Sequence, residues 1–286
     1  MYNFYEAIRN DPKYFRQFNC GEALITKYTC PVATTLTDVW SQHNYIVYVI
    51  DGRKVWHTAD GSYDLHKGVC LFVRKGACIV EQFFDPDFCT VMFFIPDEFI
   101  CDVLKNKFQL TKKATKNFNI VLPVHKNETL EGFFYSMTPY FNSSKDPDHT
   151  LLELKFRELI LSVTDNPMNA ELIGFFHSLA NEPQSVSLKR VMNDNYCFNL
   201  KLEEFAELSN RSLSAFKRDF QKIYNATPGK WLTEKRLTHA MHLLSNMNKT
   251  VSETAFESGF ENPSHFSRAF KEYFGISPAS VKKQVA

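Results

Sequence analysis

The sequence has no run of about 18 or more apolar residues, and its start lacks the basic stretch and apolar core of a secretory signal. The first absence argues against a membrane span and the second against export. Its seven cysteines are scattered without a C-x-x-C pair. This disfavours disulfides and a zinc finger and suits buried free thiols. We expect a cytoplasmic protein with no membrane partner.

Clustered imidazoles are also lacking. Catalytic cupins hold their metal with a His-x-His pair, a carboxylate and a later histidine. Here His43, His57 and His66 are far apart and no His-x-His occurs. A metal-dependent cupin enzyme is therefore kept only as an alternative, and we expect no enzyme, no metal and no cofactor.

The 286 residues suffice for two domains with separate cores, and 44% of them are apolar, including 27 Phe. The net charge of +1 hides an uneven distribution. Residues 1–183 carry 18 Lys and Arg against 22 Asp and Glu, whereas residues 184–286 carry 15 against 10. A polyanion would therefore bind the C-terminal third.

The N-terminal part has a strand pattern over residues 23–96. Apolar runs 45–50 and 54–57 flank Asp51-Gly52, a strong hairpin signal, and a second pair of strands brackets Arg74-Lys75-Gly76. Another strand covers residues 89–95. Short strands with tight turns predict an antiparallel β-sandwich or barrel.

From about residue 98 the pattern becomes helical. Apolar residues over 151–163 predict a helix that Asp165-Asn166-Pro167 ends, and another helix runs over 170–179. The polar segment 181–185 is the best linker. Everything after it has a helical pattern, so the fold class is α+β.

The last ninety or so residues contain an internal repeat. Each copy has a small Ala one turn before a Gly or Asn that suits a left-handed helix end, and a second helix with two Phe four residues apart. The pattern predicts two helix-turn-helix units with second helices 212–224 and 263–274, joined by a helix over 229–245 of about 25 Å. Matching positions are Phe216, Arg218, Phe220 and Pro228 with Phe266, Arg268, Phe270 and Pro278 at an offset of 50, and Leu202, Glu204, Ala206 and Asn210 with Val251, Glu253, Ala255 and Gly259 at an offset of 49.

Local capping signals support these boundaries. Ser212 and Asn262 are good N-caps, the latter followed by Pro263. Thr250 and Glu253 form a capping box, whereas the matching Lys201 is a poor cap, so the helix over 202–208 should fray more.

The faces opposite the Phe pairs carry side chains suited to DNA. B-DNA presents its major groove again every ~34 Å, so one chain can fill two successive grooves. Arginine pairs with guanine, and lysine suits phosphate. The predicted contacts are Ser214, Lys217, Arg218 and Lys222 in the first unit and Ser264, His265, Arg268 and Lys271 in the second.

The repeat, the Thr227-Pro-Gly-Lys-Trp segment and the run Gly259–Pro278 resemble the DNA-binding domain of AraC/XylS-type transcription regulators. The resemblance implies a sequence-specific DNA-binding regulator that binds double-stranded DNA, usually activates transcription and contacts RNA polymerase. It implies a cupin-like sensor domain over 1–110, a helical dimerisation segment over 111–183 with a homodimer, and the DNA-binding domain over 184–286. The front part is also similar to the sensor domain of type III secretion activators, which a protein partner controls rather than a metabolite.

Three other functional hypotheses stay open. Cys70, Cys78 or Cys89 could sense redox state, since Arg74-Lys75 lies near Cys78 in sequence. An effector, small molecule or protein, could act on the β-rich domain. The C-terminal helices could instead form a protein-interaction module, which would lack the steep salt dependence of DNA binding. The aromatic residues that could line a small-molecule pocket are Trp40, Tyr48 and Trp56.

Overall fold

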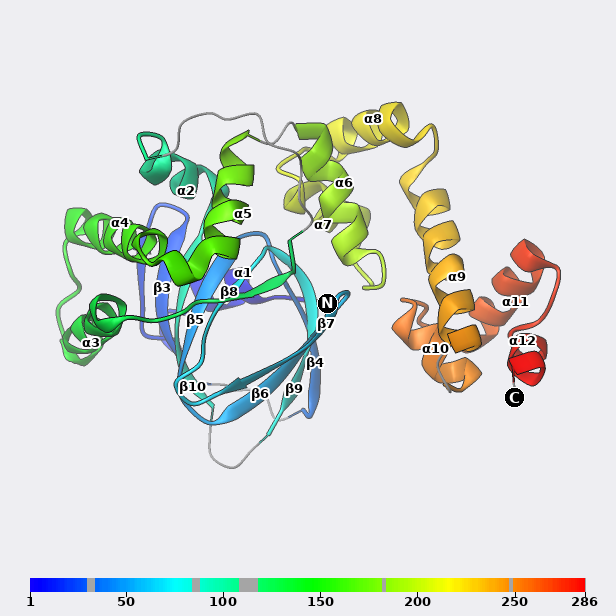
Figure 1. The fold of residues 1–286 in the computed structure, drawn as a ribbon, viewed down its shortest axis with the longest axis horizontal. Coiled ribbons are helices and arrows are strands. Elements are labelled where there is room, and N and C mark those ends of the chain that lie inside the picture. The colour runs from blue at the N-terminus through cyan, green and yellow to red at the C-terminus, as the bar shows by residue number, and fades with distance from the viewer. Residues whose placement is uncertain (30–33, 84–87, 108–117, 182–183, 247–248, 286) are drawn as a thin grey trace. The chain divides into compact units, whose positions relative to one another are not determined.

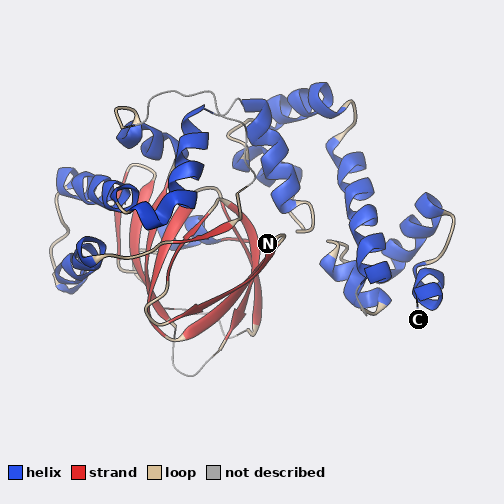
Figure 2. Ribbon diagram, in the orientation of Figure 1, coloured by secondary structure: helices blue, strands red, loops and turns tan. Residues whose placement is uncertain are grey.

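The computed structural model describes the chain except for residues 30–33, 84–87, 108–117, 182–183, 247–248 and 286. It divides into an N-terminal unit, Met1–Pro183, and a C-terminal unit, Gln184–Ala286. The first combines β-sheet with helices and the second is helical (Figure 1, Figure 2). The predicted α+β fold class is confirmed. The expected boundary at residue 110 and the centre of the linker, 182–183, lie outside the described residues.

The strands of the N-terminal unit form two sheets. They are β1 (Tyr2–Asn3), β2 (Gln17–Cys20), β3 (Ala23–Thr29), β4 (Leu36–Ser41), β5 (Asn44–Asp51), β6 (Arg53–Thr58), β7 (Gly61–His66), β8 (Cys70–Val73), β9 (Gly76–Gln82), β10 (Cys89–Ile95) and β11 (Val121–Pro123). Within the described residues, one sheet has the order β1-β4-β9-β6-β7 and the other β11-β8-β5-β10-β3-β2. The short pair of β1 with β4 is parallel, and the other pairs are antiparallel.

The strands on either side of Asp51-Gly52 and of Arg74–Gly76 do not pair with each other, so the prediction of a hairpin at each of these turns is wrong. The strands form where expected, but the two strands of each pair enter different sheets. β5 pairs with β8 and β10, whereas β6 pairs with β7 and β9. Similarly, β8 pairs with β5 and β11, and β9 with β4 and β6. At Gly52, φ of 81° turns the chain from one sheet to the other.

The six-stranded sheet is covered on both faces, which accounts for many of the phenylalanines. Successive residues of a strand point to opposite faces. In β10, the Phe93 ring lies 5.5 Å from that of Phe133 and 6.3 Å from that of Phe156, both in helices. The next residue, Phe94, lies 5.2 Å from Tyr45 in the core shared with the other sheet. Both phenylalanines are fully buried.

The helices of the N-terminal unit include the one predicted over 151–163, which is confirmed as part of α4. The expected stop is also found, because Asn166 caps a short 3-10 turn, Pro167–Asn169. The segment 111–183 is not helical throughout, however, because β11 pairs with β8 in the sheet. The helices are α1 (Phe4–Arg9), α2 (Asp97–Leu104), α3 (Glu128–Asn142), α4 (His149–Asp165) and α5 (Ala170–Asn181).

The described part of the C-terminal unit is helical, as predicted. The two helix-turn-helix units and the helix between them form at the predicted positions, with boundaries that differ by about one residue. The helices are α6 (Gln184–Asn195), α7 (Leu202–Leu208), α8 (Leu213–Tyr224), α9 (Pro228–Asn246), α10 (Val251–Glu257), α11 (Pro263–Phe274) and α12 (Pro278–Val285).

Two of the cysteines considered for redox sensing are inert in this fold. Cys70 and Cys78 are buried, and burial raises the pKa of both thiols, that of Cys78 to about 12. A reactive cysteine needs a thiolate near neutral pH. These two residues therefore act as small apolar core residues, and Cys89 is half-buried.

We expect a thiol-alkylating reagent at about pH 8 to leave Cys70 and Cys78 unmodified in the folded protein, because neither is accessible or ionised. Both should react once guanidinium unfolds the chain. Mass spectrometry of the peptides measures each site. Rapid modification of either residue in the folded protein would contradict this assignment.

Candidate nucleic-acid interface

The two halves of the C-terminal unit contain the same hydrogen-bonded turn. Asn210 and Gly259 each end the first helix of their unit, with φ of 54° and 82°. This left-handed conformation lets the next backbone N–H groups reach the last carbonyl groups of the helix. The sequence repeat is therefore also a structural repeat. The matching bonds are Asn210 N to Glu207 O (2.9 Å) and Arg211 N to Ala206 O (2.9 Å), and Gly259 N to Phe256 O (3.0 Å) and Phe260 N to Ala255 O (2.9 Å).

The second helices are capped as predicted. The Ser212 hydroxyl accepts a hydrogen bond from the N–H of Ala215 (3.3 Å) at the start of α8. The Asn262 side chain accepts from two N–H groups at the start of α11. Asn225 and Gly275 end these helices in the left-handed conformation. Local sequence thus fixes where α8 and α11, here called the recognition helices, begin and end.

A pair of buried phenylalanines holds each recognition helix. Phe216 and Phe220 in α8 have ring centroids 5.8 Å apart, and Phe266 and Phe270 in α11 have theirs 5.5 Å apart. All four side chains are fully buried. Residues two positions after the first Phe lie about 200° around the helix from it, so they face outward.

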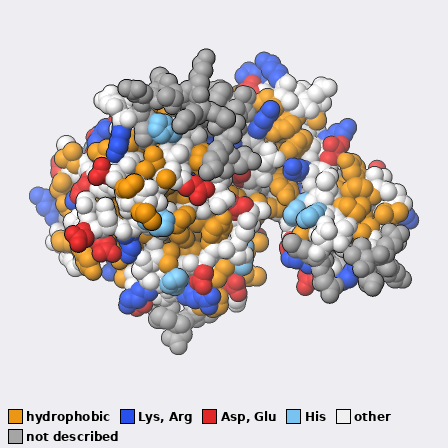
Figure 3. All heavy atoms as spheres, viewed as in Figure 1, with side chains coloured by type: hydrophobic (Ala, Val, Ile, Leu, Met, Phe, Trp, Pro, Cys, Tyr) orange, Lys and Arg blue, Asp and Glu red, His pale blue; other side chains and the backbone are white. Residues whose placement is uncertain are grey.

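The eight side chains predicted to contact DNA are all exposed, and basic side chains project from α8 in the space-filling view (Figure 3). They lie opposite the phenylalanine pairs or at the edges of that face. The structure thus leaves both sets accessible. They are Ser214, Lys217, Arg218 and Lys222 on α8 and Ser264, His265, Arg268 and Lys271 on α11.

The two matching arginines differ in their neighbours. The Arg218 side chain is 65% exposed, and its Nε donates to Asp219 Oδ1 (3.3 Å). Asp219 also accepts from the buried Arg211 (3.3 Å). Burial would raise the pKa of Asp219, but the hydrogen bonds from Arg211 and Arg218 lower it. The second unit has Ala269 at the matching position.

Asp219 is therefore a residue that the sequence analysis did not identify. The repeat contained the signal, since a carboxylate stands in one copy where the other has a methyl group. In the part of the chain that the structure describes, Arg268 has no ion-pair partner. The bond to Asp219 thus partly fixes the orientation of the Arg218 guanidinium, whereas no such bond fixes that of Arg268 among the described residues.

The helix between the units contacts both of them. α9 has 19 residues, about 28 Å at 1.5 Å per residue. Near its start, the Trp231 ring lies 6.0 Å from that of Phe220 in α8. Further along, Leu237 and Leu244 share a buried cluster with Phe266 and other residues of the second unit. One helix therefore joins the cores beneath the two recognition helices.

Two family models match the chain. Residues 205–284 match a helix-turn-helix domain, and residues 44–175 match the ExsA N-terminal regulatory domain. The predicted resemblance to the AraC/XylS-type transcription regulators is confirmed. The predicted function, a DNA-binding transcription regulator, is confirmed at this level.

Relatives of this regulator match over most of its length. The virulence regulon transcriptional activator VirF of Yersinia enterocolitica is 24% identical over 245 residues, covering 82% of this chain and 87% of that protein. The HTH-type transcriptional regulator ExsA of Pseudomonas aeruginosa is 29% identical over 241 residues, covering 83% and 85%. The structure of ToxT from Vibrio cholerae covers 92% of this chain and 97% of that one at 10% identity, but its TM-score of 0.38 supports no conclusion.

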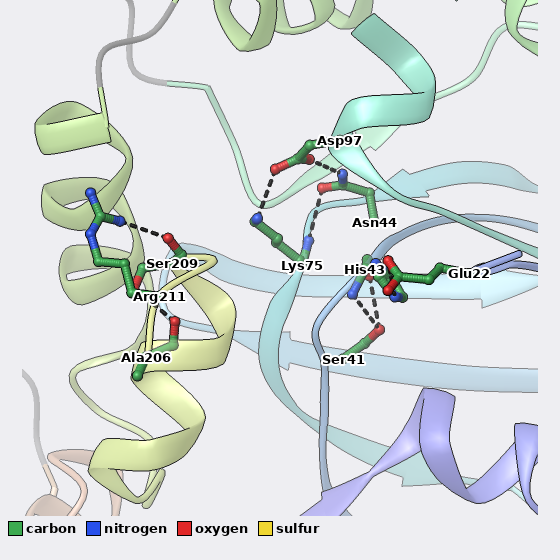
Figure 4. Close-up of polar contacts among 9 residues, drawn as sticks. All are labelled: Glu22, Ser41, His43, Asn44, Lys75, Asp97, Ala206, Ser209 and Arg211. Atoms are coloured by element: carbon green, nitrogen blue, oxygen red, sulfur yellow. Dashed lines mark hydrogen bonds and ion pairs between the residues drawn. The ribbon is translucent and has the colours of Figure 1, made fainter. Parts of the chain in front are cut away.

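Two of the histidines considered as metal ligands, His43 and His57, contact other side chains of the N-terminal unit. Among the described residues, no group of three His, Cys, Asp or Glu side chains is placed to hold a metal. His43 lies among Ser41, Glu22 and Lys75 (Figure 4). Burial and the nearby Lys75 charge lower the pKa of His43 to about 4, so its imidazole is neutral near pH 7. His57 contacts Ser62 and Glu81.

Of the three aromatic residues expected to line a pocket, one does so. Trp56 lines a cavity of about 30 Å³ in the β-rich core, together with Tyr28, Lys54 and Phe88. Tyr48 instead stacks on Phe134 of α3, 4.4 Å away, on the other face of its sheet. Trp40 is buried elsewhere. Of the three candidates, Trp56 lines the cavity, and Tyr48 and Trp40 are core aromatics.

The capping prediction can be tested with a matched pair of variants. In the second unit, Thr250 N donates to the Glu253 carboxylate (2.7 Å) and Glu253 N donates to the Thr250 hydroxyl (3.2 Å), the two bonds of a capping box. The Thr250 N–H and the Thr250 hydroxyl both donate to the carboxylate and lower the pKa of Glu253. In the first, Glu204 accepts from the N–H of Lys201 (2.6 Å), but no side chain caps the helix. Thr250→Ala should cost about 1 kcal/mol of unfolding free energy, and Lys201→Ser should stabilise the unit by a smaller amount.

Thermal unfolding measures both changes. The lowered pKa of Glu253 means that its contribution is complete near neutral pH and is lost as acid protonates the carboxylate. Thr250→Ala keeps the backbone bond to the carboxylate but removes the hydrogen bond that the Thr250 hydroxyl donates to it (2.8 Å), so the difference between Thr250→Ala and wild type should shrink at low pH. An unchanged difference would show that the box does not act through the Glu253 carboxylate.

Proposed function

We propose that this regulator activates transcription by placing α8 and α11 in two successive major grooves of B-DNA. The observation that carries the proposal is the structural repeat: the same turn, caps and phenylalanine pair present two polar helix faces on one connecting helix of about 28 Å. That length is close to the ~34 Å repeat of the groove. Activation is supported by relatives that are themselves named transcriptional activators.

Each side chain has a role that follows from its chemistry. Arg218 and Arg268 lie centrally on the exposed faces, where a guanidinium pairs with the two acceptors of guanine. Lys222 and Lys271, one turn further along, contact phosphates. The remaining predicted contacts, Ser214, Lys217, Ser264 and His265, lie at the start of the helices, the end that enters the groove in helix-turn-helix proteins.

The activating step needs RNA polymerase as a partner, and the protein acts in the cytoplasm, where the bacterial relatives have their DNA. The N-terminal unit receives the signal. Its cavity of about 30 Å³ holds one or two water molecules, far less than the 300–1,000 Å³ of ordinary ligand pockets. This small size favours a protein effector over a metabolite at this position.

A homodimer would form through α4. Most of its apolar residues face the core, but Leu151, Leu154 and Leu161 are exposed, and Leu154 is 57% exposed. With Glu158, these residues follow the 3-4-3 spacing of a coiled-coil seam. An exposed leucine stripe of this kind gains about 25 cal/mol for each Å² buried against a second copy.

Arg268→Ala should weaken binding to a selected site by about 1–3 kcal/mol and relax preference at one base pair, because the arginine contacts a base. Lys271→Ala should weaken all sequences alike and reduce the salt slope by about 1, because lysine neutralises a phosphate. Gel-shift titrations at several salt concentrations separate the two effects.

Lys67→Ala is the charge-matched control. Lys67 is exposed on the N-terminal unit and contacts Asp51 (3.7 Å). Its loss removes one positive charge outside the C-terminal unit, so binding should be unchanged. If Arg268→Ala behaved like this control, α11 would not be a recognition helix.

Leu154→Glu should convert the dimer to a monomer, because it removes the most exposed leucine of the stripe and adds a second carboxylate one turn from Glu158, and burying two like charges together is costly. Sedimentation velocity over a range of concentrations measures the change. Met168→Glu is the matched control, since Met168 is equally exposed at 68% but lies outside α4. A wild-type protein that stays monomeric at high concentration would refute the proposed dimer.

A further inference from the structure

The segment Tyr196–Asn199 connects α6 to α7 in the first half of the C-terminal unit. It is held firmly, because the side chains of Phe198 and of Leu200, the residue that follows the segment, are buried and Phe198 N donates to Asn195 O (3.1 Å). The segment belongs to neither copy of the sequence repeat and contains none of the motifs described above. Its contacts nevertheless reach two elements outside the first helix-turn-helix unit.

The first of these elements is α9. The Arg236 guanidinium donates from Nε to the carbonyl oxygen of Tyr196 (2.6 Å) and from Nη2 to that of Phe198 (2.7 Å). Hydrogen bonds from a charged donor are roughly twice as strong as those between neutral groups. Burial lowers the pKa of Arg236, while the nearby Glu261 raises it. Arg236 therefore holds the 196–199 segment against α9 through two of its N–H groups.

The second element is the turn between α10 and α11. A methyl group at Gly259 would lie 2.7 Å from the carbonyl oxygen of Cys197 and 3.0 Å from Nε of Arg236. Real Cβ atoms do not approach backbone this closely, so the turn needs glycine here. Beside it, the Asn199 amide donates to the carboxylate of Glu261. The segment thus touches the turn that immediately precedes the second recognition helix.

The repeat provides an internal comparison. The turn of the first unit has Asn210 at the matching position, with a similar left-handed φ of 54° and an exposed side chain. Glycine is therefore not required by the turn itself. It is required in the second copy because the 196–199 segment packs against it.

We propose that Arg236 and the segment 196–199 form a brace that fixes α11 relative to α8 and so sets the spacing between the two DNA motifs this regulator accepts. The proposal rests on the proposed function, because spacing matters only if both helices bind DNA. One added base pair moves a motif by about 3.4 Å and turns it by about 35°. Each helix-turn-helix unit packs against one side of α9. The brace is a second connection between the two units, and it resists rotation of one unit relative to the other about the axis of α9.

Arg236 is a positioning residue in this account, so its test compares DNA sites rather than affinity alone. The full chain first selects a duplex with two motifs from a random library. Binding is then measured to that duplex, to one with a single intact motif, and to duplexes with one base pair inserted or deleted between the motifs. Low salt keeps the weaker complexes measurable.

Arg236→Gln should lower affinity for the selected duplex about tenfold, because the DNA rather than the two lost hydrogen bonds must then hold α11 in register with α8. Affinity for the single motif should stay within about twofold, and the penalty for one inserted base pair should shrink. Asn199→Ala removes only the contact with Glu261 from an exposed position, so it should act in the same direction with less risk to folding.

Gly259→Ala and Asn210→Ala are a matched pair. Both place alanine at a left-handed turn residue, but only Gly259→Ala also collides with Cys197. Only the first should relax the spacing preference. Equal losses on the single motif and on the selected duplex, or an unchanged insertion penalty in Arg236→Gln and Asn199→Ala, would overturn the brace. A wild-type protein that binds scrambled and selected duplexes alike would instead refute the proposed function.

Discussion

The exposure of the side chains proposed to contact DNA depends on the burial of the phenylalanine pairs beneath them. Burying one phenylalanine stabilises a fold by about 1.5–3 kcal/mol, whereas an exposed ion pair contributes about 0–1 kcal/mol. Phe216 and Phe220 therefore decide which face of α8 points inward, and the helix period then places Arg218 on the opposite face. The same reasoning applies to Arg268 in α11, which needs no interaction of its own to be exposed.

The C-terminal unit could be predicted from the sequence because its determinants are local. In α11, an N-cap at Asn262, a proline in the first turn and a left-handed Gly275 all lie within a few residues of the helix they delimit. Each acts through hydrogen bonds to its own neighbours in the chain. The repeat then supplied a second, independent copy of the same signals, so the boundaries of α8 could be checked against those of α11.

The β-rich unit was predicted only in part. Its strands were found because alternation and β-branched composition are local, but their partners were not, because pairing joins residues far apart in the sequence. In β10, Phe93 and Phe94 are both fully buried. A sheet covered on both faces loses the alternation of polar and apolar residues that would show which side chains share a core. This is why the sequence could name Tyr48 and Trp56 only as candidates for one pocket, whereas they lie in two different cores.

The two copies of the repeat differ at positions where one copy makes a contact that the other lacks. Local rules ask only for a left-handed residue at the turn, and Asn210 and Gly259 both satisfy them. The choice of glycine in the second copy comes from a segment whose contact with this turn joins residues 62 positions apart. Asp219 and Ala269 differ for a similar reason, because only the first unit has a buried Arg211 to neutralise. A repeat in sequence therefore predicts the common fold of its copies, while the positions at which they diverge indicate contacts that only one copy makes, either within its own unit, as at Asp219, or with a distant segment, as at Gly259.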